Sequence, residues 1–373
     1  MTSADPAAES TDPTDSIAAG LTAAIGIGVF AALAPTALLS GRYLLVAAVA
    51  AGAIATVIAV FARPLGRVVG SRIGRTRGQA ADEASHGTIT LAADIIWLLA
   101  RLAVLAALAD SFGAYAMPTH PLLAALCVLV FVTAADALRL RPPTALLVVG
   151  LVVMFIALGA LVAVCVAISA PPSTGVPVPT GIPGSVGLSG VLPATGVMLV
   201  AFAEPAGPER VTRGRRRLIV PLVSLAGFLA VAWAVLYQLG PERLAVSPAP
   251  LRDALGAADA SELRPLLFVG ALVASVLALL IVFWDVRRTG RRIIGRGRPG
   301  ASVFRSAGRS PEQASGWRTV TTAVLIGAVA AVLAWALGPV AAMGIAASFV
   351  VVRYILMALS AALRHQPGGT VGR

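Results

Sequence analysis

Ile25-Gly26-Ile27-Gly28-Val29-Phe30 lies in the middle of the first apolar segment of the chain. Two glycines two residues apart weaken a helix. In hydrocarbon, an unpaired peptide group costs several kcal/mol, so a broken helix persists only where it is buried in protein or lines a cavity. The motif therefore has two interpretations. Either a discontinuous helix builds a binding site near the bilayer midplane, or small residues let two helices pack closely.

The composition excludes an ordinary soluble domain. Of 373 residues, 58% are hydrophobic and 12% are charged, and the mean hydropathy is +0.89. These values indicate a polytopic membrane protein. A net charge of +12 would suggest a nucleic-acid partner in a soluble protein, but arginines held on one side of a membrane explain it here. The short Arg296-Gly297-Arg298-Pro299 match to a minor-groove DNA-binding element arises easily by chance in such a loop, so we expect no nucleic-acid partner.

A hydropathy window of about 19 residues predicts ten transmembrane helices. We expect these spans near 17–40, 42–62, 89–111, 120–138, 144–170, 187–207, 217–239, 264–285, 319–337 and 340–363.

The arginines predict the orientation of these spans. They gather after the second, fourth, sixth and eighth spans, with the largest cluster between Arg287 and Arg318, whereas the intervening loops contain few. This alternation predicts a multi-pass protein of the cytoplasmic (inner) membrane with both termini in the cytoplasm. Residues 1–15 are polar and acidic, unlike a cleaved signal peptide, so they are expected to form a disordered cytoplasmic tail.

Five segments, in order, carry a resemblance to a known family. They are Ile25–Phe30 (IGIGVF), 101–118, 150–159, 190–202 (GVLPATGVMLVAF) and 341–361. In these segments the chain resembles a divergent member of the amino acid–polyamine–organocation (APC) superfamily of permeases. The order and spacing of the segments carry the resemblance more than any single motif.

The resemblance implies an all-α fold of about ten transmembrane helices, the core of the leucine-transporter fold, with discontinuous helices one and six. Residues 16–170 and 187–363 would form two inverted five-helix repeats, joined by an extracytoplasmic Pro/Gly-rich loop at 171–186. Residues 1–15 and 364–373 would be cytoplasmic tails.

The same resemblance implies a substrate site between the two breaks. Free backbone N–H groups at a half-helix end attract an anion. The substrate-binding residues would be Gly26, Ile27, Gly28, Phe30, Phe202, Ala203 and Glu204. The register of the sixth helix leaves an alternative open, in which Glu204 belongs to the following cytoplasmic loop.

Ionisable residues inside the spans form a second group of candidates. A central charge costs roughly 2.5–3.5 kcal/mol on insertion scales, so each should face a cavity or a partner. Glu204 and Arg353 are expected to pair beside the site; alternatively, Glu204 lies at the cytoplasmic end and Arg353 reaches the interface. Asp94 and Arg101 are seven residues apart and share a helix face, which predicts a structural ion pair or the lining of a cytoplasmic vestibule.

The function implied is alternating-access transport of amino acids or related amines. The lysine that couples transport in many family members is absent, because Val148 stands at its position. The alternative is a degenerate, transporter-like membrane scaffold or regulatory protein. The spans contain no clustered histidines, cysteines or paired carboxylates, so neither an enzyme, a cofactor nor a metal site is expected. The expected partners are a small-molecule substrate, the bilayer, and anionic lipids at the cytoplasmic arginines.

Overall fold

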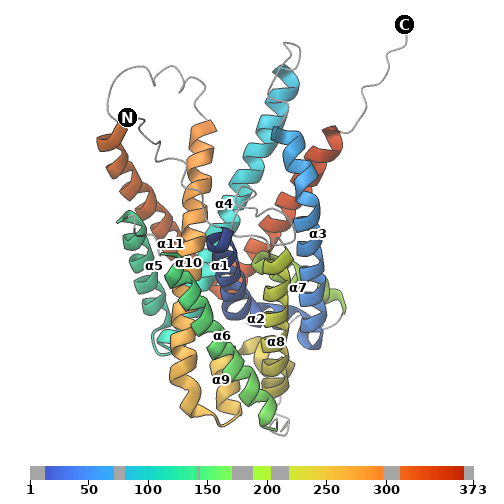
Figure 1. The fold of residues 1–373 in the computed structure, drawn as a ribbon, viewed down its shortest axis with the longest axis vertical. Coiled ribbons are helices and arrows are strands. Elements are labelled where there is room, and N and C mark those ends of the chain that lie inside the picture. Colours follow the sequence, from blue (N-terminus) through green and yellow to red (C-terminus); the bar gives the residue numbers. More distant parts are fainter. Residues whose placement is uncertain are drawn as a thin grey trace.

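Every element that the structure describes is a helix (Figure 1). This structure is a computed structural model, and it describes residues 13–70, 80–138, 140, 143–169, 188–202, 218–296 and 311–364. The expected loop at 171–186, most of both tails, and the candidate site residues Ala203 and Glu204 lie outside the described residues.

In chain order, the described helices are α1 (Pro13–Ile25), the π-helix η1 (Gly26–Ala32), α2 (Leu33–Ser40), the 3₁₀-helix η2 (Gly41–Tyr43), α3 (Leu44–Gly70), α4 (Ala80–Ala116), α5 (Pro121–Ala137), α6 (Thr144–Ala167), α7 (Leu188–Phe202), α8 (Ile219–Val246), α9 (Pro250–Ala257), the 3₁₀-helix η5 (Ser261–Leu263), α10 (Arg264–Arg296) and α11 (Pro311–Arg364).

Six stretches of the described chain are long and apolar enough to cross a membrane, which confirms the polytopic, all-helical fold class. They are Ile17–Ala59, Ile89–Ala116, Thr144–Ala167, Ile219–Val246, Ser261–Arg291 and Val320–Leu359. The apolar helices α5 and α7 are shorter. Three of the six stretches contain a turn at a glycine with positive φ: Gly41 (φ 53°) follows α2, Gly240 (φ 74°) lies within α8, and Gly338 (φ 65°) divides α11.

The stretch 240–263, which connects the expected spans 217–239 and 264–285, is mostly helical. Gly240 has φ 74° and ψ 164°, a conformation open to glycine, and Pro241 starts a new helical turn that continues α8 to Val246. The short helix α9 follows and buries Leu251 and Leu255. No separate span was expected here, because Arg252 and Asp253 lower the mean hydropathy of α9.

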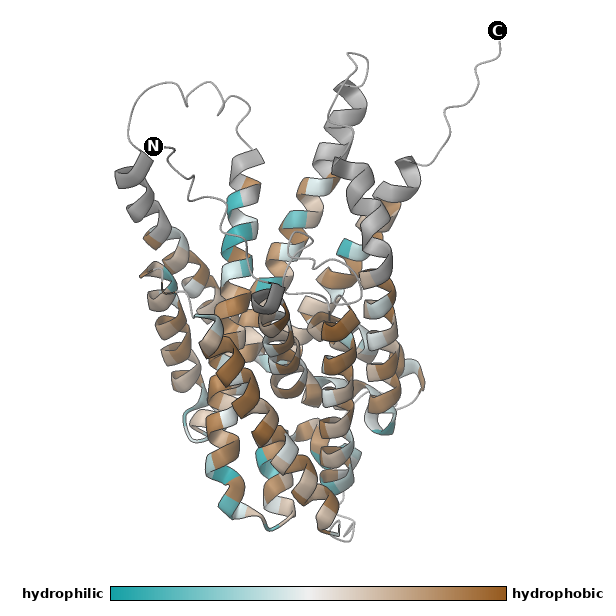
Figure 2. Ribbon diagram, in the orientation of Figure 1, coloured by the Kyte–Doolittle hydropathy of each residue, from teal (hydrophilic) through white to brown (hydrophobic). Residues whose placement is uncertain are grey.

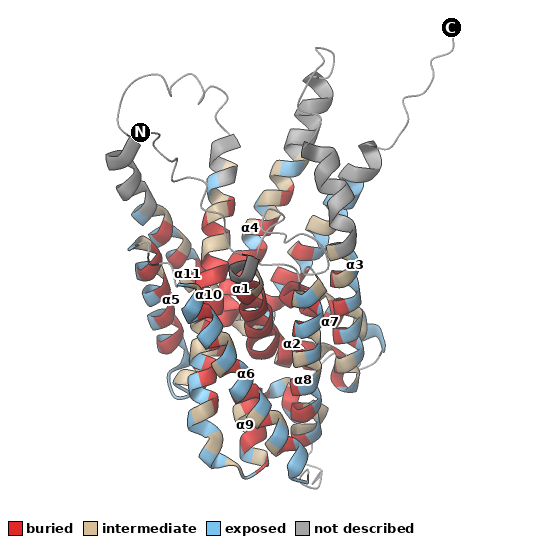
Figure 3. Ribbon diagram, in the orientation of Figure 1, coloured by how far each residue is buried: buried red, intermediate tan, exposed pale blue. Residues whose placement is uncertain are grey.

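The first helix lies at the centre of the bundle. In the most apolar part of Ile17–Ala59, 89% of the residues are buried, against 33% in Thr144–Ala167 and 22% in Val320–Leu359. Helix α1 packs against α6, α8 and α10, while α2 packs against α7 and α8. Figure 3 shows the buried residues concentrated on α1 and α2 and on the inner faces of the neighbouring helices.

The outer faces of the bundle are apolar (Figure 2). Leu192 is 80% exposed, Trp335 is 72% exposed and Val130 is 68% exposed. A contiguous apolar surface of this kind needs a nonpolar solvent, which the acyl chains of a bilayer provide.

The two ends of the bundle differ. Helix α9 and the end of α6 lie at one end, whereas α10 ends and α11 both begins and ends at the other (Figure 1). We call the second end the arginine-rich end, because α10 carries Arg287, Arg288 and Arg291 there.

Helix α10 should place η5 and the arginine-rich end on opposite sides of the membrane, because its 27-residue rise from Arg264 to Arg291 is about 40 Å. We expect Glu262→Cys to react with a membrane-impermeant maleimide on intact cells, in a Cys127→Ser, Cys165→Ser background. Arg291→Cys should react only after permeabilisation. Labelling of both positions from the same side would contradict this arrangement.

Candidate functional site

The glycine motif of the first span forms a π-helical turn. Residues Gly26–Ala32 make up η1, and all seven are buried. A π-helix widens the backbone coil from i→i+4 to i→i+5 hydrogen bonding, and such turns occur frequently at functional sites. The chain is therefore helical through the motif, with a locally widened coil where we expected a discontinuity.

The two glycines have different packing roles. A Cβ atom at Gly26 would lie 2.8 Å from the Cβ of Ala278 in α10, closer than such atoms approach. A Cβ atom at Gly28 would meet Phe228 at 3.4 Å and Ala201 at 3.5 Å, which is ordinary contact. Gly26 thus serves close helix packing, whereas the space around Gly28 does not by itself require glycine.

The end of α7 lies beside this π-helical turn. Ala201 of α7 faces Gly28, and Phe202, the last residue of α7, packs edge-on against Phe228 with ring centroids 6.3 Å apart. The structure therefore brings together five of the predicted substrate-binding residues: Gly26, Ile27, Gly28, Phe30 and Phe202. All five are buried, and Phe30 and Phe202 are each 5% exposed, so side chains fill the space between η1 and α7.

Phe30 connects the π-helical turn to the end of the bundle that carries α9. Its ring packs edge-on against Tyr115 near the end of α4, with centroids 5.5 Å apart. The backbone N–H of Leu251 in α9 donates a hydrogen bond to the Tyr115 hydroxyl at 3.2 Å. We call this connection, from Phe30 through Tyr115 to Leu251, the outer contact.

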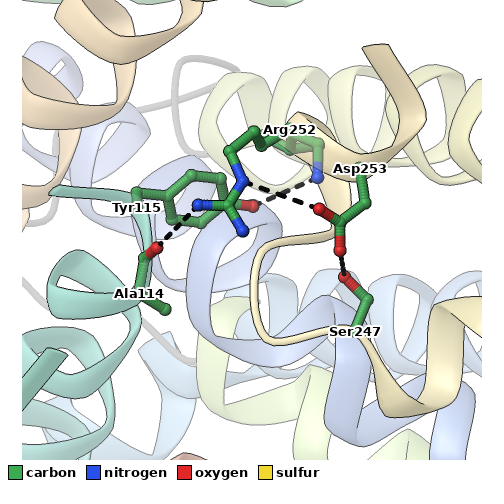
Figure 4. A network of polar contacts seen from close by, with 6 residues as sticks. Ala114, Tyr115, Ser247, Arg252 and Asp253 are labelled. Atoms are coloured by element: carbon green, nitrogen blue, oxygen red, sulfur yellow. Dashed lines mark hydrogen bonds and ion pairs between the residues drawn. The ribbon is translucent and has the colours of Figure 1, made fainter. Parts of the chain in front are cut away.

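Polar contacts hold α9 in place around the outer contact (Figure 4). Arg252 donates to the Ala114 carbonyl oxygen at 3.4 Å, and its Nε lies 3.6 Å from Asp253. The Ser247 hydroxyl donates to Asp253 at 2.6 Å, which joins the end of α8 to α9. These contacts tie a short helix of eight residues to the end of α4.

A buried charge cluster joins α4, α10 and α11. It consists of Trp97, Arg101, Asp285 and Arg353. One oxygen of Asp285 lies 3.3 Å from Nε of Arg101 and accepts a hydrogen bond from Nε1 of Trp97 at 3.1 Å. The Trp97 ring lies beneath two guanidinium groups, at 4.0 Å for Arg101 and 3.8 Å for Arg353. Cation–π contacts of this kind strengthen when they are desolvated.

Two members of this cluster were missed by sequence reasoning. Trp97 precedes Arg101 by four residues and therefore lies on the same helix face, a spacing that could have identified it. Asp285 lies on α10 and gives no local signal of its partner in α4. Arg353 lies in the cluster, and Asp94 is half-buried on α4.

A second buried ion pair lies on the opposite side of α10. Nη1 of Arg287 lies 2.6 Å from Asp136 of α5, and both residues are at least 91% buried. Asp285 and Arg287 are two residues apart, so they point to nearly opposite faces of the helix. Helix α10 is thereby attached to α4 by one ion pair and to α5 by the other.

The described residues offer backbone, aromatic and guanidinium groups for recognition. No three His, Cys, Asp or Glu side chains gather there in an arrangement that could hold a metal ion. The centre of the bundle combines a widened helix with aromatic contacts, and the cluster adds two guanidinium groups and one carboxylate. Such groups can form hydrogen bonds and ion pairs with a small polar molecule.

No family model matches the chain. Proteins described as uncharacterized transporters from Mycobacterium tuberculosis and Mycobacterium bovis are 30% identical to it over 298 residues. The match covers 74% of this chain and 63% of each relative, so the chain spans less than two thirds of their length. The chain is therefore a helical membrane protein similar to proteins named as transporters.

Replacing Gly26 by alanine should destabilise the protein by about 1–3 kcal/mol, because the new methyl group overlaps Ala278. Gly28→Ala should change the free energy of unfolding by less than about 1 kcal/mol. Adding Ala278→Gly to Gly26→Ala should restore stability in detergent unfolding measurements. Equal losses for the two single variants would contradict the packing role of Gly26.

Replacing Asp285 by asparagine should cost about 3 kcal/mol or more, because it leaves Arg101 buried without its carboxylate. The control Asp253→Asn removes a carboxylate whose side chain is 38% exposed and should cost about 1 kcal/mol or less. Unfolding in mixed detergent measures both values. The double variant Arg101→Met, Asp285→Leu should recover most of the loss, and equal costs for the two single variants would refute the cluster's role.

Proposed function

We propose that this chain is a secondary transporter that moves amino acids or related amines across the cytoplasmic membrane by alternating access. Its similarity to proteins named as transporters supports the class. The observation that carries the proposal is the contact between the π-helical turn η1, whose seven residues are all buried, and the end of α7.

The proposed architecture has ten crossings in two inverted repeats, residues 16–170 and 187–363. Ile17–Ala59 and Val320–Leu359 would each cross twice, since Gly41 and Gly338 turn the chain within them. The shorter helices α5, of 17 residues, and α7, with 15 described residues, would also cross. The two termini would lie on the cytoplasmic side, with the arginine-rich end.

Substrate recognition would fall to main-chain groups of η1. Opening the π-helical turn toward α7 would free peptide N–H groups around Gly26 and Gly28 for a carboxylate, at the positive end of a half-helix. Phe30 and Phe202 would then enclose the rest of the substrate. The packed arrangement of η1 and α7 corresponds in this proposal to a substrate-free, closed state.

For each side of the membrane, the structure contains a contact that could close the proposed substrate site. The outer contact links Phe30 to α9, so movement of α9 would expose the site from that end. Toward the arginine-rich end, the buried charge cluster joins three helices that must separate for substrate to leave. Breaking these contacts in alternation would give access from one side at a time.

The role of Glu204 remains part of this proposal. In the first register of helix six it would pair with Arg353, which the structure places in the buried charge cluster. In the second register it would lie in the cytoplasmic loop. Asp94 and Arg101 would line the inner vestibule. The chain has no lysine to couple transport, so exchange or uniport fits the proposal.

A second candidate function is a transporter-like membrane scaffold or regulatory protein. It is favoured by the tight packing of the proposed site, where Ile27 is fully buried and Phe30 is 5% exposed. A protein that no longer carries substrate would keep the bundle and lose the need for a cavity.

Purified protein in liposomes, given a panel of radiolabelled amino acids and amines, tests transport directly. We expect saturable uptake of at least one compound, and at least a tenfold loss with Gly28→Leu, because the larger side chain would block movement of η1 against Phe228 and Ala201. The control Gly159→Leu places the same side chain in open space on an exposed face of α6 and should transport normally.

Absence of uptake for every compound, by protein that is folded and correctly inserted, would refute transport and favour the scaffold. Equal loss in both glycine variants would refute a specific role for η1.

A further inference from the structure

A cavity of about 230 Å³ lies away from the proposed site, between α4, α10 and α11. Its wall is made mainly of aliphatic side chains, among them Leu102, Val286 and Ile326. None of the residues expected to bind a transported substrate lines it. An aliphatic cavity of this size does not attract water, so it suits a hydrocarbon chain.

The cavity opens toward the bilayer-facing surface of α11. Leu325 and Val329 belong to its wall and are 66% and 38% exposed. Leu102 and Val286, on the inner side of the wall, are buried. A lipid chain could therefore enter sideways from the membrane without crossing a polar barrier.

The polarity of the cavity changes along the membrane normal. The lining of α11 runs from Thr322 to Val329, about 10 Å of helix, away from the arginine-rich end. On α10, the lining residues Arg287 and Arg291 lie at the arginine-rich end. A phospholipid has the same order, with a charged head group at the surface and an apolar chain inside.

Arg287, which contributes to the wall of this cavity, carries an unsatisfied donor. Its Nη1 is bound to Asp136, but its buried Nε has no hydrogen-bond partner within the described part of the chain. A buried donor without an acceptor costs free energy, so an acceptor at this position would be stabilising. Arg291, one turn further along α10, is exposed at the mouth of the cavity.

We propose that this cavity binds one anionic phospholipid of the inner leaflet, with an acyl chain among Leu102, Leu325 and Val329 and the phosphate beside Arg287 and Arg291. Charge complementarity selects the occupant, since basic pockets between transmembrane helices on the cytoplasmic side bind anionic head groups. A zwitterionic lipid would bring a quaternary ammonium group to the same arginines. The lipid would join α10 to α11 and stabilise their packing, independently of transport.

Native mass spectrometry of the full chain tests this site. The protein is incubated with equimolar palmitoyl-oleoyl phosphatidylglycerol and phosphatidylcholine. We expect one phosphatidylglycerol to be retained in preference to phosphatidylcholine. Arg291→Gln should weaken that preference about fivefold. Arg264→Gln, which removes an exposed arginine from the opposite end of α10, should leave it unchanged.

A variant whose side chain fills the cavity provides a second test of lipid binding. Leu325→Trp places a bulky ring in the cavity and should abolish retention of the lipid. Val332 also precedes Gly338 in α11, is 61% exposed and lies outside the cavity wall. The control Val332→Trp should therefore still retain the lipid. Equal retention by the two tryptophan variants, equal binding of the two lipids, or displacement of lipid by a second copy of the chain would overturn the proposal.

Discussion

The first helix is enclosed by its neighbours because its π-helical turn cannot face lipid. In hydrocarbon every peptide group must find its partner within the protein, and a widened π-helical turn satisfies this requirement less well than a regular α-helix. Such a turn is therefore tolerated only behind neighbouring helices. Helices α7, α8 and α10 surround η1 closely enough that Gly26 has no room for a methyl group beside Ala278.

The same enclosure requires the buried charged side chains of α10 to pair with side chains of neighbouring helices. Asp285 and Arg287 extend from opposite faces of α10, and each finds its partner on a neighbouring helix. A buried ion pair adds little stability relative to apolar packing, yet breaking it is costly. The two pairs therefore specify how α10 docks against α4 and α5 more than they strengthen the fold.

Hydropathy and arginine spacing predicted the all-helical membrane fold and the positions of helices such as α5 and α6. They predicted the ends of the long helices less well. Helix α10 continues past its apolar span to Arg296, because arginine is a good helix former. The motif at Ile25–Phe30 identified the centre of the bundle, but glycine spacing cannot distinguish a break from a π-helical turn. Trp97 and Asp285 escaped prediction because their contacts join helices far apart in sequence.

In the proposed transport cycle, η1 and α7 separate. Reactivity of a cysteine at Ala201, which faces Gly28, reports this separation in a chain whose native cysteines are replaced by serine. If the helices separate, Ala201→Cys reacts with a small hydrophilic thiol reagent far faster than Ala330→Cys, which is equally buried on α11. Equally slow reaction at both positions would contradict the account.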